Sequence, residues 1–294
     1  MKRTLLALCT LVSFACATNP ATTTTPPAAA PATATAPASA EPQCNEGTVI
    51  LNATLWIERA AEYRASAIQT YSAARRALDL ALADPTWTGA EEETPGGETQ
   101  PPAVILDLDE TALDNSGAQT AAIRAGKTYD KTMWKEWTRQ GIAPAVPGAA
   151  EFLAYARSRG VTPFYVTNRD LDEEPGTRAN LERLNFPLDP NVDTLLQRGE
   201  NGWKTSDKSP RRAFVASKYR VLLLIGDDLN DFTTASGKTL AERDEIFART
   251  ATQWGSRWFI LPNPMYGSWE TAAIAGDATQ CEKIQRRLNA LREK

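Results

Sequence analysis

The chain has 294 residues, of which 42% are hydrophobic and 23% are charged, and its net charge is −4. This composition is typical of a globular protein with one large or two small domains, and the acidic balance gives no basic face for nucleic acid. Because the sequence contains no histidine, a Ser-His-Asp triad, a phosphohistidine intermediate and a histidine-ligated zinc site are excluded. Any catalysis must then use carboxylates, hydroxyls, lysine or a hard metal ion.

The N-terminal residues have the pattern of an export signal. Lys2 and Arg3 precede an apolar run too short to span a bilayer, which predicts a signal peptide over residues 1–15. Cys16 then has two interpretations: the acylated first residue of an outer-membrane or periplasmic lipoprotein, or an ordinary residue beside the cleavage site of a secreted protein. In the first case the lipid anchor would be the contact with the membrane.

Low-complexity Ala, Thr and Pro fill residues 16–43. Such a segment cannot bury a core, so we expect an extended tether. The folded part is expected to follow, and we divide it into a helical lead-in and loop, a catalytic core and a C-terminal helix, at residues 44–100, 101–275 and 276–294.

Two cysteines lie near opposite ends of this folded part. Cys44 opens it and Cys281 lies in the C-terminal segment. In an oxidising compartment the two could form a disulfide; the alternative is a pair of buried, unpaired thiols.

The first predicted element is helical. Residues 52–82 have apolar side chains at helical spacing and no proline or glycine, which predicts one long amphipathic helix or two in tandem. If the apolar stripe is exposed, two copies could pair as a homodimer; otherwise the stripe covers the functional site. A loop rich in turn-forming residues follows over residues 84–102.

Four nearly continuous apolar runs then occur, at residues 103–108, 161–166, 220–225 and 257–261. Runs without polar alternation are typical of strands buried on both faces. Helical stretches such as 148–160 and 209–219 separate them. Strands that alternate with helices indicate a parallel α/β sheet, and ligands of such sheets bind beyond the carboxyl ends of the strands.

Three of these strands end in polar residues: Asp107, Asp109 and Thr111, then Thr167, Asn168 and Arg169, then Gly226, Asp227 and Asp231. Asp107, Asp227 and Asp231 would repel one another unless they shared a cation. Oxygen ligands without histidine favour a hard ion, and we expect one Mg²⁺. Carboxylates, a hydroxyl, a lysine and Mg²⁺ at one point suit phosphoryl transfer. The lysine is either Lys208 or Lys204.

These motifs, in this order, resemble the haloacid dehalogenase (HAD) superfamily of phosphotransferases. More narrowly, the chain resembles the class C bacterial acid phosphatases in DLDETALDNS, AVPGAAEFL, FYVTNR, IGDDLNDF and LPNPMYGSWE. The resemblance extends over about residues 51–274. It implies a Rossmann-like core with a parallel sheet flanked by helices, plus a smaller helical domain built largely from the N-terminal helix.

The resemblance also implies the chemistry of a phosphomonoester hydrolase. Asp107 would be the nucleophile that forms an aspartyl-phosphate, and Asp109 would act as general acid and then as general base. The metal would be held by the side chains of Asp107 and Asp227 and the main-chain carbonyl of Asp109, with Asp231 acting through a water. Thr167 would donate to the phosphoryl oxygens, and Lys208 would neutralise their charge.

Relatives in this class include 5′-nucleotidases, so the expected substrates are small phosphate monoesters such as nucleoside monophosphates. Trp134 and Tyr266 match positions where relatives present rings to a flat group, and stacking of this kind tolerates any base; packing in the core is the alternative for both. Asn168 and Arg169 are expected beside the substrate. Relatives commonly have Pro-Tyr where this chain has Gly117-Ala118, which puts the nucleotide preference in doubt.

Two rival interpretations compete with the enzyme. A receiver-type signalling domain also gathers acids, a threonine and a lysine around Mg²⁺, but it lacks D-x-D-x-T and is normally cytosolic. A catalytically silent, phosphatase-like storage or binding protein would be favoured by loss of the nucleophile or of the general acid. Asp107 and Asp109 are both present, which favours the acid phosphatase.

Overall fold

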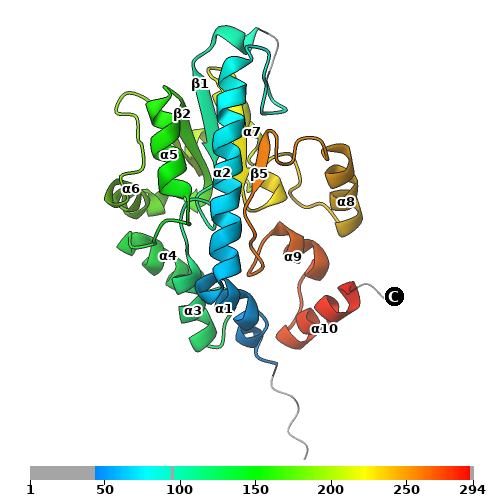
Figure 1. Cartoon of the computed structure of the whole chain (residues 1–294). Coiled ribbons are helices and arrows are strands. Elements are labelled where there is room, and N and C mark those ends of the chain that lie inside the picture. The colour runs from blue at the N-terminus through cyan, green and yellow to red at the C-terminus, as the bar shows by residue number, and fades with distance from the viewer. Residues whose placement is uncertain (1–43, 94–95, 292–294) are drawn as a thin grey trace, which may run out of the picture. The chain divides into compact units, whose positions relative to one another are not determined.

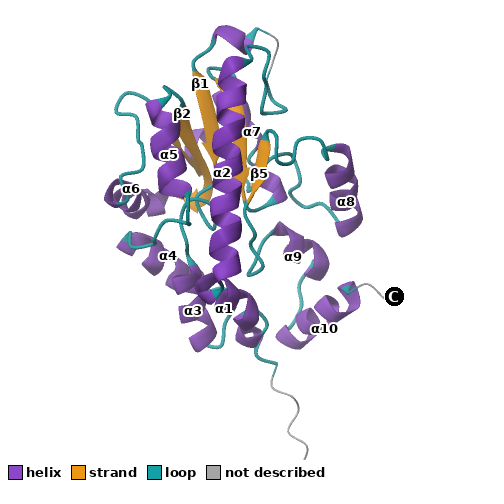
Figure 2. Cartoon of the chain, viewed as in Figure 1, coloured by secondary structure: helices purple, strands orange, loops and turns teal. Residues whose placement is uncertain are grey.

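Five parallel strands form one sheet, in the order β3-β2-β1-β4-β5. Figure 2 shows this sheet between layers of helices. The parallel α/β sheet predicted from the sequence is therefore confirmed. The strands are β1 Pro102–Leu106, β2 Thr162–Asp170, β3 Leu195–Arg198, β4 Arg220–Gly226 and β5 Trp258–Ile260.

The computed structural model describes residues 44–93 and 96–291. The predicted signal peptide, Cys16 and the predicted tether over residues 16–43 lie outside these described residues. None of the helices in the described part is long and apolar enough to cross a membrane.

Two strand features differ from the sequence prediction. Strand β3 was not predicted, because its four residues end in Gln197 and Arg198 and give no continuous apolar run. Strand β2 continues through residues 167–170 instead of ending at residue 166, since Asp170 still pairs with Arg198 of β3. Thr167, Asn168 and Arg169 therefore lie within β2 and not in the loop after it, so the hydrogen bonds of the sheet fix their backbone.

Alternate side chains of β1 enter two separate core layers. Val104 and Leu106 pack with Tyr71 of helix α2 (Ala61–Ala83) and Phe152 of helix α5 (Ala149–Ser158). Ala103 and Ile105 instead pack with Val215 of helix α7 (Ser209–Ala216) on the opposite face. The period of two expected for a strand thus places one helical layer on each face. Figure 1 shows α2 and α5 together in front of the sheet.

The N-terminal helical pattern forms two helices in tandem. Helix α1 (Leu51–Arg59) ends at Ala60, whose backbone is extended at φ −71° and ψ 132°, and α2 begins directly after it. Ile57 and Tyr63, on either side of the break, pack on Met265 from the other end of the chain. The sequence has no proline or glycine here, so no local helix breaker marks the position that packs on this distant residue.

Two groups of helices stand beyond the carboxyl ends of the strands (Figure 1). Helix α1 packs on α3 (Ser116–Arg124), and α3 packs on α4 (Lys131–Gln140). On the other side, α9 (Ser268–Ile274) packs on α10 (Gln280–Ala290). Helix α9 also contacts α8 (Leu240–Arg249), which lies level with β5 at the side of the sheet (Figure 1). Helix α6 (Glu174–Arg183) connects β2 to β3. Short 3₁₀ turns occur at Glu46–Thr48, Gly97–Thr99, Leu171–Glu173, Glu200–Gly202 and Leu229–Asp231.

A disulfide joins Cys44 to Cys281, with their Cα atoms 5.3 Å apart. It fastens the start of the described chain to α10. Arg287 of α10 also forms a salt bridge with Glu270 of α9, at 2.9 Å. The C-terminal helix is therefore tied both to α9 and to the N-terminal end of the folded part.

Candidate active site

Neighbouring strands bring three acidic side chains together. Asp107 follows β1 directly, and its N–H donates to the carbonyl of Ile225 on β4 at 3.0 Å, which sets it beside the loop that starts after Gly226. Carboxylate oxygens of Asp107, Asp227 and Asp231 all lie within 4.8 Å of one another. A group of this kind can hold a metal ion through oxygen ligands.

Lys208 lies between two of these acids. Its Nζ donates to Oδ1 of Asp107 and, at 2.6 Å, to Oδ1 of Asp231, and only 6% of its side chain is exposed. Burial alone would lower the pKa of Lys208, but Asp107 and Asp231 raise it above its ordinary value, so the ammonium stays charged. Lys204, the alternative from the sequence, is exposed. The structure thus brings Lys208 to the acids.

The residues directly after β4 hold the Asp231 side chain. Its Oδ2 accepts hydrogen bonds from the N–H groups of Asp227 and Asp228, at 3.0 and 2.9 Å. A Cβ atom at Gly226 would come within 2.3 Å of the Asp231 side chain. The glycine of the G-D-x-x-x-D pattern is therefore needed for this close approach.

Asp227 is held by two neutral donors. Thr111 Oγ1 donates to its Oδ1 at 3.0 Å, and Asn263 Nδ2 donates to its Oδ2 at 2.9 Å. Burial raises the pKa of Asp227 well above its ordinary value, and the charges of Asp231 and Asp107 raise it further. The single charge of Lys208 cannot offset the charges of all three acids when they are ionised, so a further cation would stabilise the cluster.

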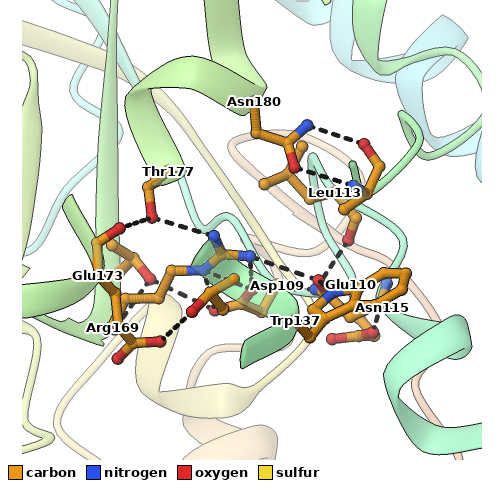
Figure 3. Close-up of polar contacts among 12 residues, drawn as sticks. Asp109, Glu110, Leu113, Asn115, Trp137, Arg169, Glu173, Thr177 and Asn180 are labelled. Carbon is orange, nitrogen blue, oxygen red and sulfur yellow. Dashed lines mark hydrogen bonds and ion pairs between the residues drawn. The ribbon is translucent and has the colours of Figure 1, made fainter. Parts of the chain in front are cut away.

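Asp109 lies two residues beyond Asp107 and is held by Arg169 (Figure 3). Arg169 donates to Asp109 Oδ1 from Nη2 at 2.7 Å and from Nε at 3.0 Å. Asn115 Nδ2 donates to the same oxygen at 2.9 Å. Thr167 Oγ1 approaches Asp109 Oδ2 at 3.4 Å. The structure thus brings Thr167 to the expected general acid, and it places the Arg169 guanidinium on that acid.

Asn168 borders the cavity described below, but its amide group is already engaged. Its Oδ1 accepts from Arg211 Nη2 at 2.6 Å, and its Nδ2 donates to the carbonyl of Ser206 at 3.1 Å. Arg211, from α7, is fully buried and also donates to the carbonyl of Thr167. Arg211 therefore braces the end of β2, a role that the sequence reasoning missed.

Glu110 is a second residue that the sequence reasoning missed. It has a left-handed backbone (φ 58°), is 1% exposed, and accepts hydrogen bonds from the Tyr266 hydroxyl and from the N–H of Asn115, the latter at 3.0 Å. Burial, with the charges of Asp109 and Asp114, raises the pKa of Glu110 to about 8. The signal in the sequence was a third acid inside D-x-D-E-T, directly before the threonine.

A cavity of about 660 Å³ lies beside these groups and is bordered by Asp107, Asp109, Lys208 and Asp227. This volume lies in the range of small-molecule sites. Trp134 and Tyr266, the two rings singled out in the sequence, both border the cavity and are half-buried. The Arg169 guanidinium covers the Trp134 ring at 5.7 Å.

An acidic cluster that could hold a metal ion, with a buried lysine and a cavity beside it, therefore lies at the carboxyl end of a parallel sheet. Residues 25–269 match the family model of the HAD superfamily, subfamily IIIB (acid phosphatase). The chain therefore belongs to this subfamily.

Two solved structures are similar over most of the chain. The class C acid phosphatase from Bacillus anthracis has 33% sequence identity and a TM-score of 0.74, and the match covers 84% of this chain and 98% of that one. The same enzyme with tungstate bound has 32% identity and a TM-score of 0.74, and that match covers 85% and 99%. The resemblance to class C acid phosphatases is confirmed.

More distant relatives come from plants. A 28 kDa stem glycoprotein of Glycine max is 24% identical, over 55% of this chain and 58% of its own length. Acid phosphatase 1 of Solanum lycopersicum is 26% identical, over 55% and 57%. The chain thus spans less than two thirds of the length of these curated relatives.

Replacing Lys208 with methionine should destabilise the protein, because it leaves Asp107 and Asp231 buried without their counter-charge. We expect EDTA-treated protein at neutral pH to lose about 3–5 kcal/mol of unfolding free energy, measured by urea denaturation. The matched control is Lys204→Met at the exposed position, which should change the free energy by less than about 0.5 kcal/mol. Equal losses in the two variants would contradict the buried ion pair.

Proposed function

We propose that the protein is an Mg²⁺-dependent acid phosphatase that hydrolyses phosphate monoesters through an aspartyl-phosphate. The observation that carries this proposal is the convergence of Asp107, Asp227 and Lys208 beside a cavity at the carboxyl edge of the sheet. The similarity to a class C acid phosphatase that has been solved with tungstate supports it, because tungstate is a tetrahedral oxyanion like phosphate.

In this mechanism a carboxylate oxygen of Asp107 attacks phosphorus while the bond to the ester oxygen breaks. Asp109 gives its proton to the departing oxygen and later takes a proton from the water that attacks the aspartyl-phosphate. That second attack breaks the bond between phosphorus and Asp107 and releases inorganic phosphate. Lys208 offsets the charge of the phosphoryl oxygens, and Thr167 donates a hydrogen bond to one of them.

The chemistry of the donor set fits Mg²⁺. The carboxylates of Asp107, which is buried, and Asp227, which is half-buried, offer hard oxygen ligands, and the main-chain carbonyl of Asp109 would complete the protein's share. Asp231, which is held by the Lys208 ammonium and by two main-chain N–H groups, would act through a water. When bound, the ion supplies positive charge that offsets repulsion between the carboxylates and the phosphate.

A catalytically silent storage or binding protein is the second candidate. The similarity to stem glycoproteins, whose names give no activity, does not favour either candidate. The residues of the site favour the enzyme, since both Asp107 and Asp109 border the cavity. A binding protein would not need an acid two residues beyond the first one, held by a buried arginine.

Nucleoside monophosphates are the substrates that we propose. The rings of Trp134 and Tyr266 border the same cavity as Asp107, which suits a phosphate ester with a flat, apolar part. Arg169 covers one side of Trp134, so stacking would use the other side.

We also propose export, with Cys16 acylated, from the basic and apolar pattern of residues 2–15. Mass spectrometry of the mature N-terminus would show a lipid-modified Cys16; an unprocessed N-terminus would contradict export.

Asp107→Asn should abolish turnover, since the amide cannot form the aspartyl-phosphate, with a loss of at least about 10⁴-fold in kcat. The measurement is hydrolysis of p-nitrophenyl phosphate with Mg²⁺ at acidic pH, beside a thermal melt that shows an intact fold. Asp114→Asn, in the same loop, is the control and should keep its activity. If Asp107→Asn kept a turnover close to that of the wild type, Asp107 could not be the nucleophile and another residue would have to attack phosphorus.

EDTA should remove the activity and added Mg²⁺ should restore it. Because the ion would bind the folded state alone, Mg²⁺ should also raise the melting temperature, and more so as its concentration increases. Asp227→Asn should lose this thermal response. An EDTA-treated enzyme that keeps full activity would refute the metal requirement.

A 5′-nucleotidase should favour nucleoside monophosphates over p-nitrophenyl phosphate by a wide margin in kcat/KM. Trp134→Ala should then lower kcat/KM for the nucleotides by about 5- to 100-fold, the range expected for loss of one base–aromatic stack. A small alkyl phosphate is the control substrate, and the kcat/KM of Trp134→Ala for this ester should fall much less. Equal kcat/KM for all esters would contradict the proposed 5′-nucleotidase and indicate a phosphomonoesterase of broad specificity.

A further inference from the structure

Arg169 contacts the expected general acid, whereas the sequence pattern places it beside the substrate. We infer that Arg169 is a positioning residue, which holds Asp109 by one carboxylate oxygen and leaves the other for proton transfer. This inference rests on the proposed function, in which Asp109 is the general acid. It assigns Arg169 no contact with the substrate.

The two oxygens of Asp109 have unequal surroundings (Figure 3). Oδ1 accepts from Arg169 Nη2 at 2.7 Å, from Asn115 Nδ2 at 2.9 Å and from Arg169 Nε at 3.0 Å. Oδ2 has two contacts, both at 3.4 Å, with Thr167 Oγ1 and Arg169 Nε. Since Asp109 borders the cavity and 17% of its side chain is exposed, Oδ2 is the oxygen that can exchange a proton there.

Arg169 itself has little left to offer a ligand. Only 1% of its side chain is exposed, although it borders the cavity. All three of its side-chain nitrogens donate hydrogen bonds: Nε and Nη2 to Asp109, and Nη1 to Thr177 Oγ1 at 3.0 Å. Nη2 also donates to Asn115 Oδ1 at 3.4 Å, so four of the five N–H groups are engaged, and burial leaves the remaining N–H on Nη1 little access to a ligand.

Side chains from two helices hold Arg169 and Asn115, the two residues that donate to Asp109 Oδ1. Thr177 of α6 accepts from Nη1 and in turn donates to the carbonyl of Glu173 at 2.9 Å. Trp137 of α4 donates from Nε1 to Asn115 Oδ1 at 2.8 Å, which orients the Asn115 amide toward Asp109. The guanidinium fork and the amide therefore allow Asp109 a single orientation.

An ammonium cannot reproduce this arrangement. Lysine is a point charge without the planar fork that engages two atoms in a fixed direction. Arg169→Lys therefore keeps the positive charge near Asp109 but releases the orientation of its carboxylate.

The test uses the dependence of the rate on the leaving group. An alkoxide leaving group needs a proton from a general acid as it departs, whereas p-nitrophenolate is a good leaving group and departs with little help from a general acid. In Arg169→Lys, kcat/KM for β-glycerol phosphate should fall by about 10²-fold. The loss for p-nitrophenyl phosphate should stay below about 10-fold, and the inhibition constant of inorganic phosphate should stay within about 2-fold of that of the wild type.

A double-mutant cycle gives the second readout. If Arg169 acts through Asp109, Arg169→Lys should cause no further loss when it is added to Asp109→Asn. Additive losses, or equal losses for both esters together with weaker inhibition by phosphate, would overturn the inference and make Arg169 a substrate ligand.

Thr177→Val keeps the inference testable should Arg169→Lys fail to fold. This near-isosteric change removes the hydroxyl that holds Nη1 of Arg169. It should lower kcat/KM for β-glycerol phosphate by about 2- to 10-fold more than kcat/KM for p-nitrophenyl phosphate. An equal effect on both esters would overturn the inference. A wild-type protein that hydrolyses neither ester would refute the proposed function itself, whereas an active wild type with unselective variants refutes only the role of Arg169.

Discussion

The packing of two buried carboxylates against one ammonium is the constraint on which the rest of the structure depends. Removing an ionised carboxylate from water costs several kcal/mol unless it is paired and hydrogen-bonded. Asp107 and Asp231 share Lys208, and two main-chain N–H groups hold the second oxygen of Asp231. Such contacts need positions fixed to within a few tenths of an ångström, and only rigid elements can provide them.

The hydrophobic layers supply that rigidity. Every residue of β4 is buried, and so is β1 except at Pro102, so the two loops that carry the acids start from fixed points. Lys208 stands at the N-terminus of α7, and Val215 of that helix packs in the core layer behind the sheet. The charge that stabilises the acids is thus placed by apolar packing about two helical turns away, which couples core stability to site geometry.

The strand pattern and the acids at the strand ends were predictable from local sequence. Continuous apolar runs require burial on both faces, and a parallel sheet then brings Asp107 and Asp227 to one edge. The sequence allowed one long helix or two in tandem at the N-terminus, but the position of the break at Ala60, the short strand β3 and the link between Glu110 and Tyr266 were not predictable. Each depends on residues far apart in the chain, and propensity within a window carries no information on such partners.

The departure from the family at residue 117 has a physical explanation in this chain. A Cβ atom at Gly117 would lie 2.6 Å from the six-membered ring of Trp137, so the space that a side chain would take is filled by that indole. The same indole donates its N–H to Asn115, the residue that helps to hold Asp109. A bulkier residue at position 117 would push Trp137 away and loosen Asn115. The glycine therefore makes room for an indole that supports Asn115 beside Asp109, so residues 117 and 137 should be exchanged together or not at all.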